Sequence, residues 1–402
     1  MMSTLGSWEH GLWRWLFLEI YLPSIISAIA RGMLSISIPL YLIARGSDPL
    51  YVGIGSAAIA IGNLAMDIPG GIILGSFGER ILMRISMIVL AASTTAMALL
   101  DSPLAIVILS IAFGGGRSLW LLSRRYVVTY YVPYSYRGRA SSFIGMSERI
   151  GSFAGPGVMA LVVGDLGYRF IFLLCSLLTI ASLIPNMLSS GRGYSEYGDR
   201  PPAHGVRAIS TISPRIDAWF ISLAIVSNIA IQGVRSSRNI LLALIGKSIG
   251  LGDSSVGFAA SISGLLDVVS SYPAGVLMDK KGRGVTVAIS FSIMSIGYSL
   301  LTFSRSDYLF YISTSIIGLG NGFGSGALIT MGADIGSRMR GSRGAFFLAS
   351  WQFIGDLGSA LFPIAVGAMA SAYGLVITPL SISLISASIP AIFRRTIRRA
   401  GI

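Results

Sequence analysis

Long apolar runs, separated by short polar connections, constrain this sequence more than any other feature. A bilayer core about 30 Å thick is crossed by a helix of about 20 apolar residues, and the chain of 402 residues contains many such runs. Only 12% of the residues are charged, whereas a soluble domain has about 25%. We therefore expect an all-α membrane protein that crosses the bilayer repeatedly.

Twelve transmembrane helices are predicted, in two groups of six. The expected spans are 15–44, 50–76, 82–100, 103–130, 141–164, 168–188, 217–245, 254–278, 284–303, 307–334, 343–371 and 374–393. The expected parts of the chain are an interfacial N-terminus (1–14), a six-helix half (15–188), a linker rich in Gly, Pro, Ser and Arg (189–216), a second six-helix half (217–393) and a basic tail (394–402).

Basic residues in the expected connections predict the orientation. The side with the N-terminus holds 21 of them, among them Arg124 and Arg125, and the other side holds 4. Cytoplasmic loops of membrane proteins carry an excess of Lys and Arg. Both termini are therefore expected in the cytoplasm, and the protein is expected in the cell (plasma) membrane.

A shift of 204 residues aligns the two halves with each other. The aligned positions are Arg31 with Arg235, Val52-Gly53 with Val256-Gly257, Pro69 with Pro273, Gly71 with Gly275, Gly78 with Gly282, Gly114 with Gly318, Gly116 with Gly320, and Gly151 with Gly355. The chain is therefore predicted to be an internal duplication. Because each half has an even number of spans, the halves should be parallel repeats.

The charged stretch "PAGVLMDKKGRG" follows span eight and carries the motif that points to a family. Gly275, Asp279, Lys280, Gly282 and Arg283 match the turn between the second and third spans of a half in the major facilitator superfamily, which the chain resembles over nearly its whole length. "VPYSYRGRAS" is similar to the family's Arg-Gly turn before span five. "GSFAGP", from Gly151 to Pro156, is similar to its span-five glycine-proline motif, and Gly151 and Gly155 have the spacing of a helix-packing pair.

The resemblance implies a cytoplasmic gate at this turn. Asp279 would lie near the N-terminal end of span five, and Arg283 would approach Asp334 at the end of span ten. The alternative is that these residues only set the orientation as positive charge, which accounts for the basic residues but not for the aspartate or the glycines.

The first-half copy of the motif is degraded. Gly71, Gly78 and Arg80 are retained, but Gly75 replaces the aspartate and Glu79 replaces the first basic residue. Glu79 is a candidate partner of Arg124 or Arg125.

Charges at mid-membrane depth are costly and mark functional sites. Four of them are arginines, namely Arg31, Arg117, Arg235 and Arg238. Asn228, Gln232 and Arg235 recur on one face of span seven, and similar polar stripes carry Arg31 in span one and Arg117 in span four. The resemblance also implies that spans one, four and seven line the central cavity. The candidate substrate-binding residues are Arg31, Arg117, Asn228, Gln232 and Arg235.

A guanidinium matches carboxylate and phosphate in a bidentate manner, so these arginines favour an anionic substrate. The presence of an arginine on span one and another on span seven is similar to the pattern of the organophosphate/phosphate exchangers. The span-five histidine of those exchangers is absent here, since the histidines of this chain are His10 and His204. The alternative is that the arginines pair with Asp267 and Asp356, which are expected near mid-depth and pointing inward. These two acids are candidates either for proton coupling or for permanent salt bridges.

The sequence therefore predicts a secondary transporter that moves a small, anionic solute through a central cavity by alternating access, as a monomer. Proton-coupled efflux of drug-like compounds or metabolites remains an alternative, with protons as a candidate coupling ion. A membrane-bound sensor or enzyme is a more remote one. The sequence shows no phosphate-binding loop, dinucleotide fingerprint, nucleophile triad or metal-ligand cluster, so no cofactor, metal or enzymatic activity is expected. The basic residues are scattered among the loops, so no nucleic-acid partner is expected either.

Overall fold

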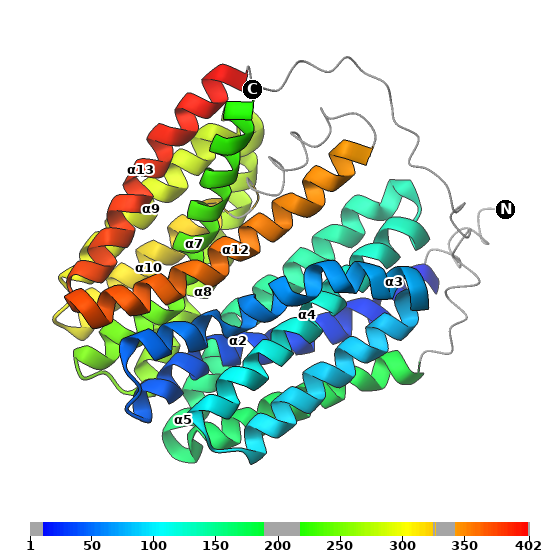
Figure 1. Ribbon diagram of the computed structural model, residues 1–402, viewed down its shortest axis with the longest axis horizontal. Helices are drawn as coiled ribbons and strands as arrows, with labels where there is room; N and C mark the ends of the chain where they lie inside the picture. The colour runs from blue at the N-terminus through cyan, green and yellow to red at the C-terminus, as the bar shows by residue number, and fades with distance from the viewer. Residues whose placement is uncertain (1–10, 189–217, 325, 327–341, 401–402) are drawn as a thin grey trace.

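The computed structural model describes residues 11–188, 218–324, 326 and 342–400, and within them it contains helices and no strand. A helical stretch, Gly11–Ala44, includes the π-helical turn Phe17–Tyr21 and α2 (Leu22–Ala44). The other long helices of the first half are α3 (Pro49–Leu99), α4 (Pro103–Tyr131) and α5 (Arg137–Leu188). Those of the second half are α7 (Ala218–Ser248), α8 (Asp253–Lys281), α9 (Arg283–Thr302), α10 (Asp307–Gly324), α12 (Ser342–Tyr373) and α13 (Ile377–Ala400), as Figure 1 shows.

Two of these helices are too long to cross a bilayer once. The 51 residues of α3 would span about 77 Å at 1.5 Å per residue. Each of α3 and α5 is interrupted by one glycine with a left-handed φ, Gly78 (79°) in α3 and Gly167 (70°) in α5. Each therefore consists of two helical arms, as the expected boundaries at 76–82 and 164–168 require.

By length and apolar composition, seven helices of the described residues could cross a membrane. The count of twelve crossings and the orientation of the termini stay predictions. The linker 189–216 lies outside the described residues, as does the end of the span expected at 307–334, because α10 is described only to Gly324. The basic stretch expected as a tail from residue 394 continues α13 as helix to Ala400.

The turns of the two halves repeat at the spacing that the sequence predicts. After α2, Gly46 has a φ of 74°, and Gly46 and Ser47 donate backbone hydrogen bonds to Ile43 and Leu42. The same turn follows α7, where Gly250 has a φ of 88° and Gly250 and Leu251 bond to Lys247 and Gly246. Such an αL glycine satisfies the last carbonyls of a helix. Gly78 and Gly282 (φ 87°) form a second pair, so both pairs are 204 residues apart.

The two halves pack closely at the end of the bundle opposite the one where α2 begins and α13 ends. We call these the opposite end and the terminal end. A Cβ on Gly53 of α3 would lie 2.6 Å from the carbonyl oxygen of Pro363 in α12, and one on Gly257 of α8 would lie 2.9 Å from the Cβ of Ala160 in α5. Gly53 and Gly257 are aligned by the 204-residue shift, so the duplication supplies both inter-half contacts.

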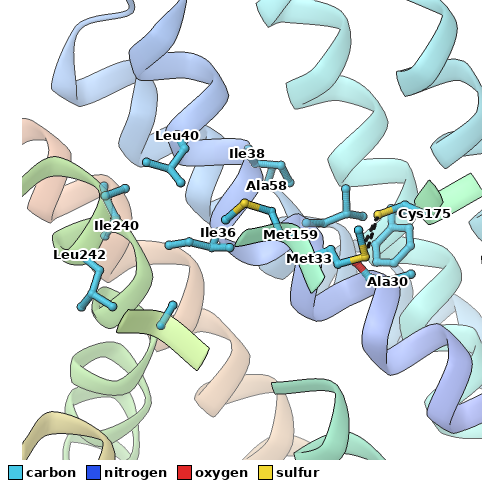
Figure 2. Packing of buried hydrophobic residues seen from close by; sticks show 14 of the residues in the cluster. Ala30, Met33, Ile36, Ile38, Leu40, Ala58, Met159, Cys175, Ile240 and Leu242 are labelled. Carbon is cyan, nitrogen blue, oxygen red and sulfur yellow. Dashed lines mark hydrogen bonds between the residues drawn. The ribbon is translucent and has the colours of Figure 1, made fainter. Parts of the chain in front are cut away.

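Apolar side chains fill the space between α2 and α7 toward the same end. Figure 2 shows Ile36 and Leu40 of α2 on the side of Ile240 and Leu242 of α7, all within one buried cluster. On its other face, α2 packs on α5, where the free thiol of Cys175 donates to the Ala30 carbonyl at 3.6 Å. In Figure 1 the helices of the two halves diverge from this packed region toward the terminal end.

Candidate functional site

One carboxylate in the first half binds three arginines. Glu148 of α5 accepts from Arg31 of α2 at 3.1 Å and from Arg117 of α4 at 3.4 Å through Oε2, and from Arg124 of α4 at 2.6 Å through Oε1. Arg31 also donates to the backbone carbonyl of Glu148 at 3.3 Å. Sequence reasoning missed Glu148, which is the centre of this cluster.

Helical spacing explains why Arg117 and Arg124 converge on one partner. They are seven residues apart, which is two turns on one face of α4, and Glu148 faces them from α5. Ser24 of α2 accepts from Arg124 at 3.1 Å. Asn63 of α3, oriented so that both neighbours are satisfied, accepts from Arg117 at 3.0 Å and donates to the Gly114 carbonyl.

Arg124 is counted among the basic residues of the cytoplasmic side, and its side chain lies inside the bundle. Its side chain is 2% exposed, and it lies about 10 Å inside the end of α4, at 1.5 Å for each residue up to Tyr131. The partner expected for it is wrong, because Glu79 instead accepts from Tyr131 at 2.9 Å. Glu148 takes the place that sequence reasoning gave to Glu79.

A second cluster lies in the other half around Asp267 of α8. Asn321 of α10 donates to the Asp267 carboxylate and accepts from Arg235 of α7 at 2.7 Å. Arg238 of α7 lies 3.9 Å from Asp267, and Arg149 of α5, from the first half, lies 3.7 Å from it. Asp267 is therefore a bridge between the halves as well as a partner of its own half.

The two clusters are related by the 204-residue shift, with the charges exchanged. Arg31 corresponds to Arg235, Asn63 to Asp267, Arg117 to Asn321, and Glu148 to Gln352. At these corresponding positions, the first half has two arginines that bind an acid on α5. The second half has one arginine, which is linked through Asn321 to an acid on α8. This correspondence is the sequence signal that could have identified Glu148.

A pair of carboxyl groups from opposite halves lies beside the first cluster. Asp67 of α3 and Asp356 of α12 are in electrostatic range of each other, and Arg125 of α4 is in electrostatic range of both. Ser118 donates to Asp67 at 2.6 Å, and Gln352 donates to Asp356 at 3.0 Å. Sequence reasoning missed Asp67 as well.

Together these groups form a polar centre with excess positive charge. Among the described residues its arginines outnumber the acids seven to four, and they are Arg31, Arg117, Arg124, Arg125, Arg149, Arg235 and Arg238. Its acids are Asp67, Glu148, Asp267 and Asp356. Arg31 and Arg117 are each 22% exposed and Glu148 is 27% exposed. These side chains face one another inside the bundle and are only partly buried there.

The expected pairing of the arginines with Asp267 and Asp356 holds only in part. Arg238 and Arg149 lie beside Asp267, but Arg31 and Arg117 contact Glu148. Arg238 of α7 is in electrostatic range of Arg31, so the arginines of the two halves approach each other.

Two other expected cavity residues pack against α12. Asn228 is buried and donates to the Trp351 carbonyl at 2.8 Å. Gln232 lies against Gly355, whose Cβ would be 3.3 Å from the glutamine Cγ. Asn228 is therefore a helix-packing residue, which corrects its expected place in the cavity wall.

Gly151 and Gly155 bring α5 close to α2. A Cβ on Gly151 would lie 2.3 Å from the Ala28 carbonyl, and one on Gly155 would lie 2.6 Å from Gly32. Pro156 follows within α5. This close approach places Glu148, one turn earlier, within reach of Arg31.

The expected gate residues lie at the terminal end. Gly282 forms the turn between α8 and α9 through its left-handed φ. Asp279 and Lys280 are exposed, and Asp279 makes no hydrogen bond or ion pair with any described residue. Gly71 and Gly275 have no neighbour within 4 Å of an added Cβ. Asp334, the expected partner of Arg283, lies outside the described residues. Glu79 and Arg80 of the degraded first-half copy lie within them.

At the opposite end, polar contacts hold the bundle together. Tyr168 of α5 donates to Asp253 of α8 at 2.6 Å, and Lys247 of α7 donates to the same carboxylate at 2.9 Å. Hydrogen bonds from Tyr41 and from Arg45 lower the pKa of Asp101, in the connection between α3 and α4. The Tyr168–Asp253 contact joins the two halves. The contacts of Tyr41 and Arg45 with Asp101 join the end of α2 to the α3–α4 connection within the first half.

The sequence matches the family model of the Major Facilitator Superfamily over residues 20–234 and again over residues 223–400. The chain belongs to the major facilitator superfamily. A double match agrees with the internal duplication, and the described helices agree with a multi-pass membrane transporter of small solutes in this superfamily.

Other members of the superfamily resemble the chain to different extents. The probable sulfoacetate transporter SauU of Cupriavidus necator is 26% identical over 148 residues, which are 37% of this chain and 34% of that protein. The match thus spans about a third of the length of this relative. The structure of a POT family transporter in complex with a thioalcohol-conjugated peptide has a TM-score of 0.80 at 11% identity, covering 97% of this chain and 96% of that one.

A D-xylose-proton symporter has a TM-score of 0.73 at 14% identity, covering 94% of this chain and 97% of that one. At these identities, the likeness to both solved structures is one of fold. Within the described residues, no group of three or more His, Cys, Asp or Glu side chains could hold a metal ion.

Proposed function

We propose that this major facilitator superfamily transporter carries a small organic anion with two charged groups, such as a carboxylate and a sulfonate. The observation that carries the proposal is the excess of arginine in the polar centre, seven against four acids. Uncompensated charge inside a membrane protein is costly and is usually functional. An anion in the cavity would offset it.

The arrangement of the arginines favours a substrate with two charged ends. Arg31 of the first half and Arg238 of the second lie in electrostatic range of each other, and both are partly exposed. Guanidinium groups bind carboxylate and similar oxyanions in a bidentate manner. One anionic group would bind Arg31 and Arg117, and the other would bind Arg238 and Arg235. Such a substrate would draw the two halves together, as alternating access about a central site requires.

The partial relative supports the same chemistry. SauU is described as a probable sulfoacetate transporter, and sulfoacetate carries a carboxylate and a sulfonate. Its match with this chain covers too little of either protein to assign a substrate, so the arginines carry the proposal and sulfoacetate provides the first probe.

The test is uptake into proteoliposomes that contain the purified protein. Sulfoacetate, malonate, xylose and tetraphenylphosphonium are supplied in turn, with and without a pH gradient that tests the coupling predicted for Asp267 and Asp356. We expect uptake of the two dianions and not of the neutral or cationic compound. Uptake of the cation in preference to the dianions would contradict the proposal and favour the efflux alternative.

Two variants test the role of the arginines. Arg31→Gln and Arg238→Gln should each weaken dianion binding by about 10-fold to 150-fold, because hydrogen bonds to charged groups contribute about 1.5–3 kcal/mol. Arg84→Gln is the matched control, since it removes the same charge from an exposed position on α3. Equal affinity in Arg31→Gln, Arg238→Gln and the control would refute the anion site.

A further inference from the structure

Glu148 lies where a carboxylate of a bound anion would lie if it were held by Arg31 and Arg117. We infer that the Glu148 carboxylate is a built-in competitor for these arginines, which a substrate anion must displace, and that it thereby sets the specificity of the site. This inference rests on the proposed transport of an anion. To that proposal it adds Glu148 as a residue that selects which solutes bind.

The two oxygens of Glu148 differ in their environment. Oε1 accepts from Arg124 at 2.6 Å, and the Arg124 side chain is only 2% exposed. Oε2 is shared by Arg31 and Arg117 at 3.1 and 3.4 Å, and both of these side chains are 22% exposed. The contacts to Oε2 are therefore longer and are shared by two partly exposed arginines, while the contact to Oε1 is short and comes from a buried arginine.

This asymmetry allows an anion to replace half of the interactions of Glu148. An incoming oxyanion can take Arg31 and Arg117 from the exposed side, while Glu148 stays bound to Arg124 and Arg124 stays bound to Ser24. The buried Arg124 is thus never left without a counter-charge, which would be strongly destabilising. Displacement requires a ligand that carries at least as much negative charge as a carboxylate.

The second half has no acid at the position that corresponds to Glu148, and its acid Asp267 lies at a longer distance, 3.9 Å, from Arg238. The residue at the corresponding position is Gln352, which is neutral and donates to Asp356. A neutral polar solute could therefore hydrogen-bond in the second half, but it could not offset the loss of the Glu148 contacts in the first. Glu148 is in this way a filter against uncharged solutes.

Removal of the competitor should strengthen anion binding, which a purely structural role for Glu148 does not predict. Glu148→Gln should bind malonate and sulfoacetate about 10-fold more tightly, a factor within the strength of charge-assisted hydrogen bonds. It should also be less stable than the wild-type protein when no anion is present, and the anion should raise its melting temperature more. Asp67→Asn removes the same charge from the polar centre, but Asp67 is bound by Ser118 rather than by an arginine proposed to hold the anion, so this variant should not tighten binding.

The experiment measures malonate and sulfoacetate binding to the full chain in nanodiscs, by calorimetry and by melting temperature. Glu148→Gln/Arg124→Gln is included because it removes the buried pair together and keeps the charge balance. Tighter binding by a folded Glu148 variant, and not by Asp67→Asn, supports the inference. Equal or weaker binding by every Glu148 variant that folds, or equal tightening by Asp67→Asn, would overturn it.

The same data separate this inference from the proposed function. If the wild-type protein binds neither dianion but Glu148→Gln does, the internal competitor is supported and transport of these dianions is not. If the wild-type protein binds a dianion and both Glu148 variants bind it no more tightly, anion transport stands and the competitor is refuted. If none of the proteins binds either dianion, both proposals fail.

Discussion

Substitution of Gly53 by alanine should change which end of the transporter is closed. Gly53 lies on α3 in the packed interface between the halves at the opposite end. An added Cβ would lie 2.6 Å from the Pro363 carbonyl oxygen and 3.1 Å from the Gly367 Cα. Ordinary contacts begin at 3.4 Å, so the oxygen would have to move by about 0.8 Å, and a backbone oxygen within α12 cannot move alone.

The cost falls on one conformation only. Overpacking of this kind costs about 1–3 kcal/mol, and it disappears when α3 and α12 separate at this end. Since each 1.4 kcal/mol is tenfold in an equilibrium, the conformation closed at the terminal end should gain about 5-fold to 150-fold in relative population. The higher helix propensity of alanine is present in both conformations and cancels.

Spin labels at Ser76→Cys and Lys280→Cys provide the assay, with the buried Cys175 replaced by serine. Both positions are exposed at the terminal end, one in each half. Gly53→Ala should increase the short-distance population measured by pulsed electron resonance. Gly75→Ala is the control on the same helix, because nothing lies within 4 Å of its added Cβ. An unchanged distance distribution in folded Gly53→Ala, or an equal shift in the control, would refute the reasoning.

Three further predictions concern the turns and the opposite end. Tyr168→Phe removes the hydrogen bond to the Asp253 carboxylate, worth about 1.5–3 kcal/mol because the acceptor is charged, so it should shift the same label distances in the same direction by a similar amount. Lengthening of the terminal-end distances would contradict this. Gly282→Ala should lower the free energy of unfolding by about 1–2 kcal/mol because of its left-handed φ, measured by thermal melting, whereas no loss would argue against the observed turn. The pKa of Asp101 is lowered in the folded protein, so its contribution to stability is complete above its unfolded pKa of about 3.9 and is lost as pH falls through the lower folded value. Acid melting curves of the wild-type protein and Asp101→Asn should therefore converge at low pH, and a constant gap would refute this.

The repeat was predictable from the sequence because backbone geometry limits which residue can occupy a turn. Gly46, Gly78, Gly250 and Gly282 all have a left-handed φ, which glycine adopts without steric cost. The 204-residue shift therefore aligns equivalent turns. The placement of Arg31, Arg117 and Arg235 on inward-facing stripes was predictable for a similar reason, since a lone charge in an apolar helix has to face the interior.

The partners of these arginines were not predictable from single helices. Glu148 is followed directly by Arg149, and an acid beside a base looks balanced when one helix is considered alone. In the folded chain, the two side chains point to different helices. Arg124 lies inside the span predicted at 103–130, and the spacing along one helix could not show that its partner is Glu148 of α5 rather than Glu79.

The adjacency of Glu148 and Arg149 connects the anion site to the contact between the halves. Glu148 binds the arginines of α2 and α4, and Arg149, the next residue of α5, lies 3.7 Å from Asp267 of the other half. Neighbouring residues of a helix cannot move independently. An anion that displaces Glu148 from Arg31 and Arg117 would therefore change the position of α5 and, with it, the long Arg149–Asp267 contact. Since allosteric coupling requires an element that both sites act on, α5 is the element through which substrate binding would bias the opening of the two halves.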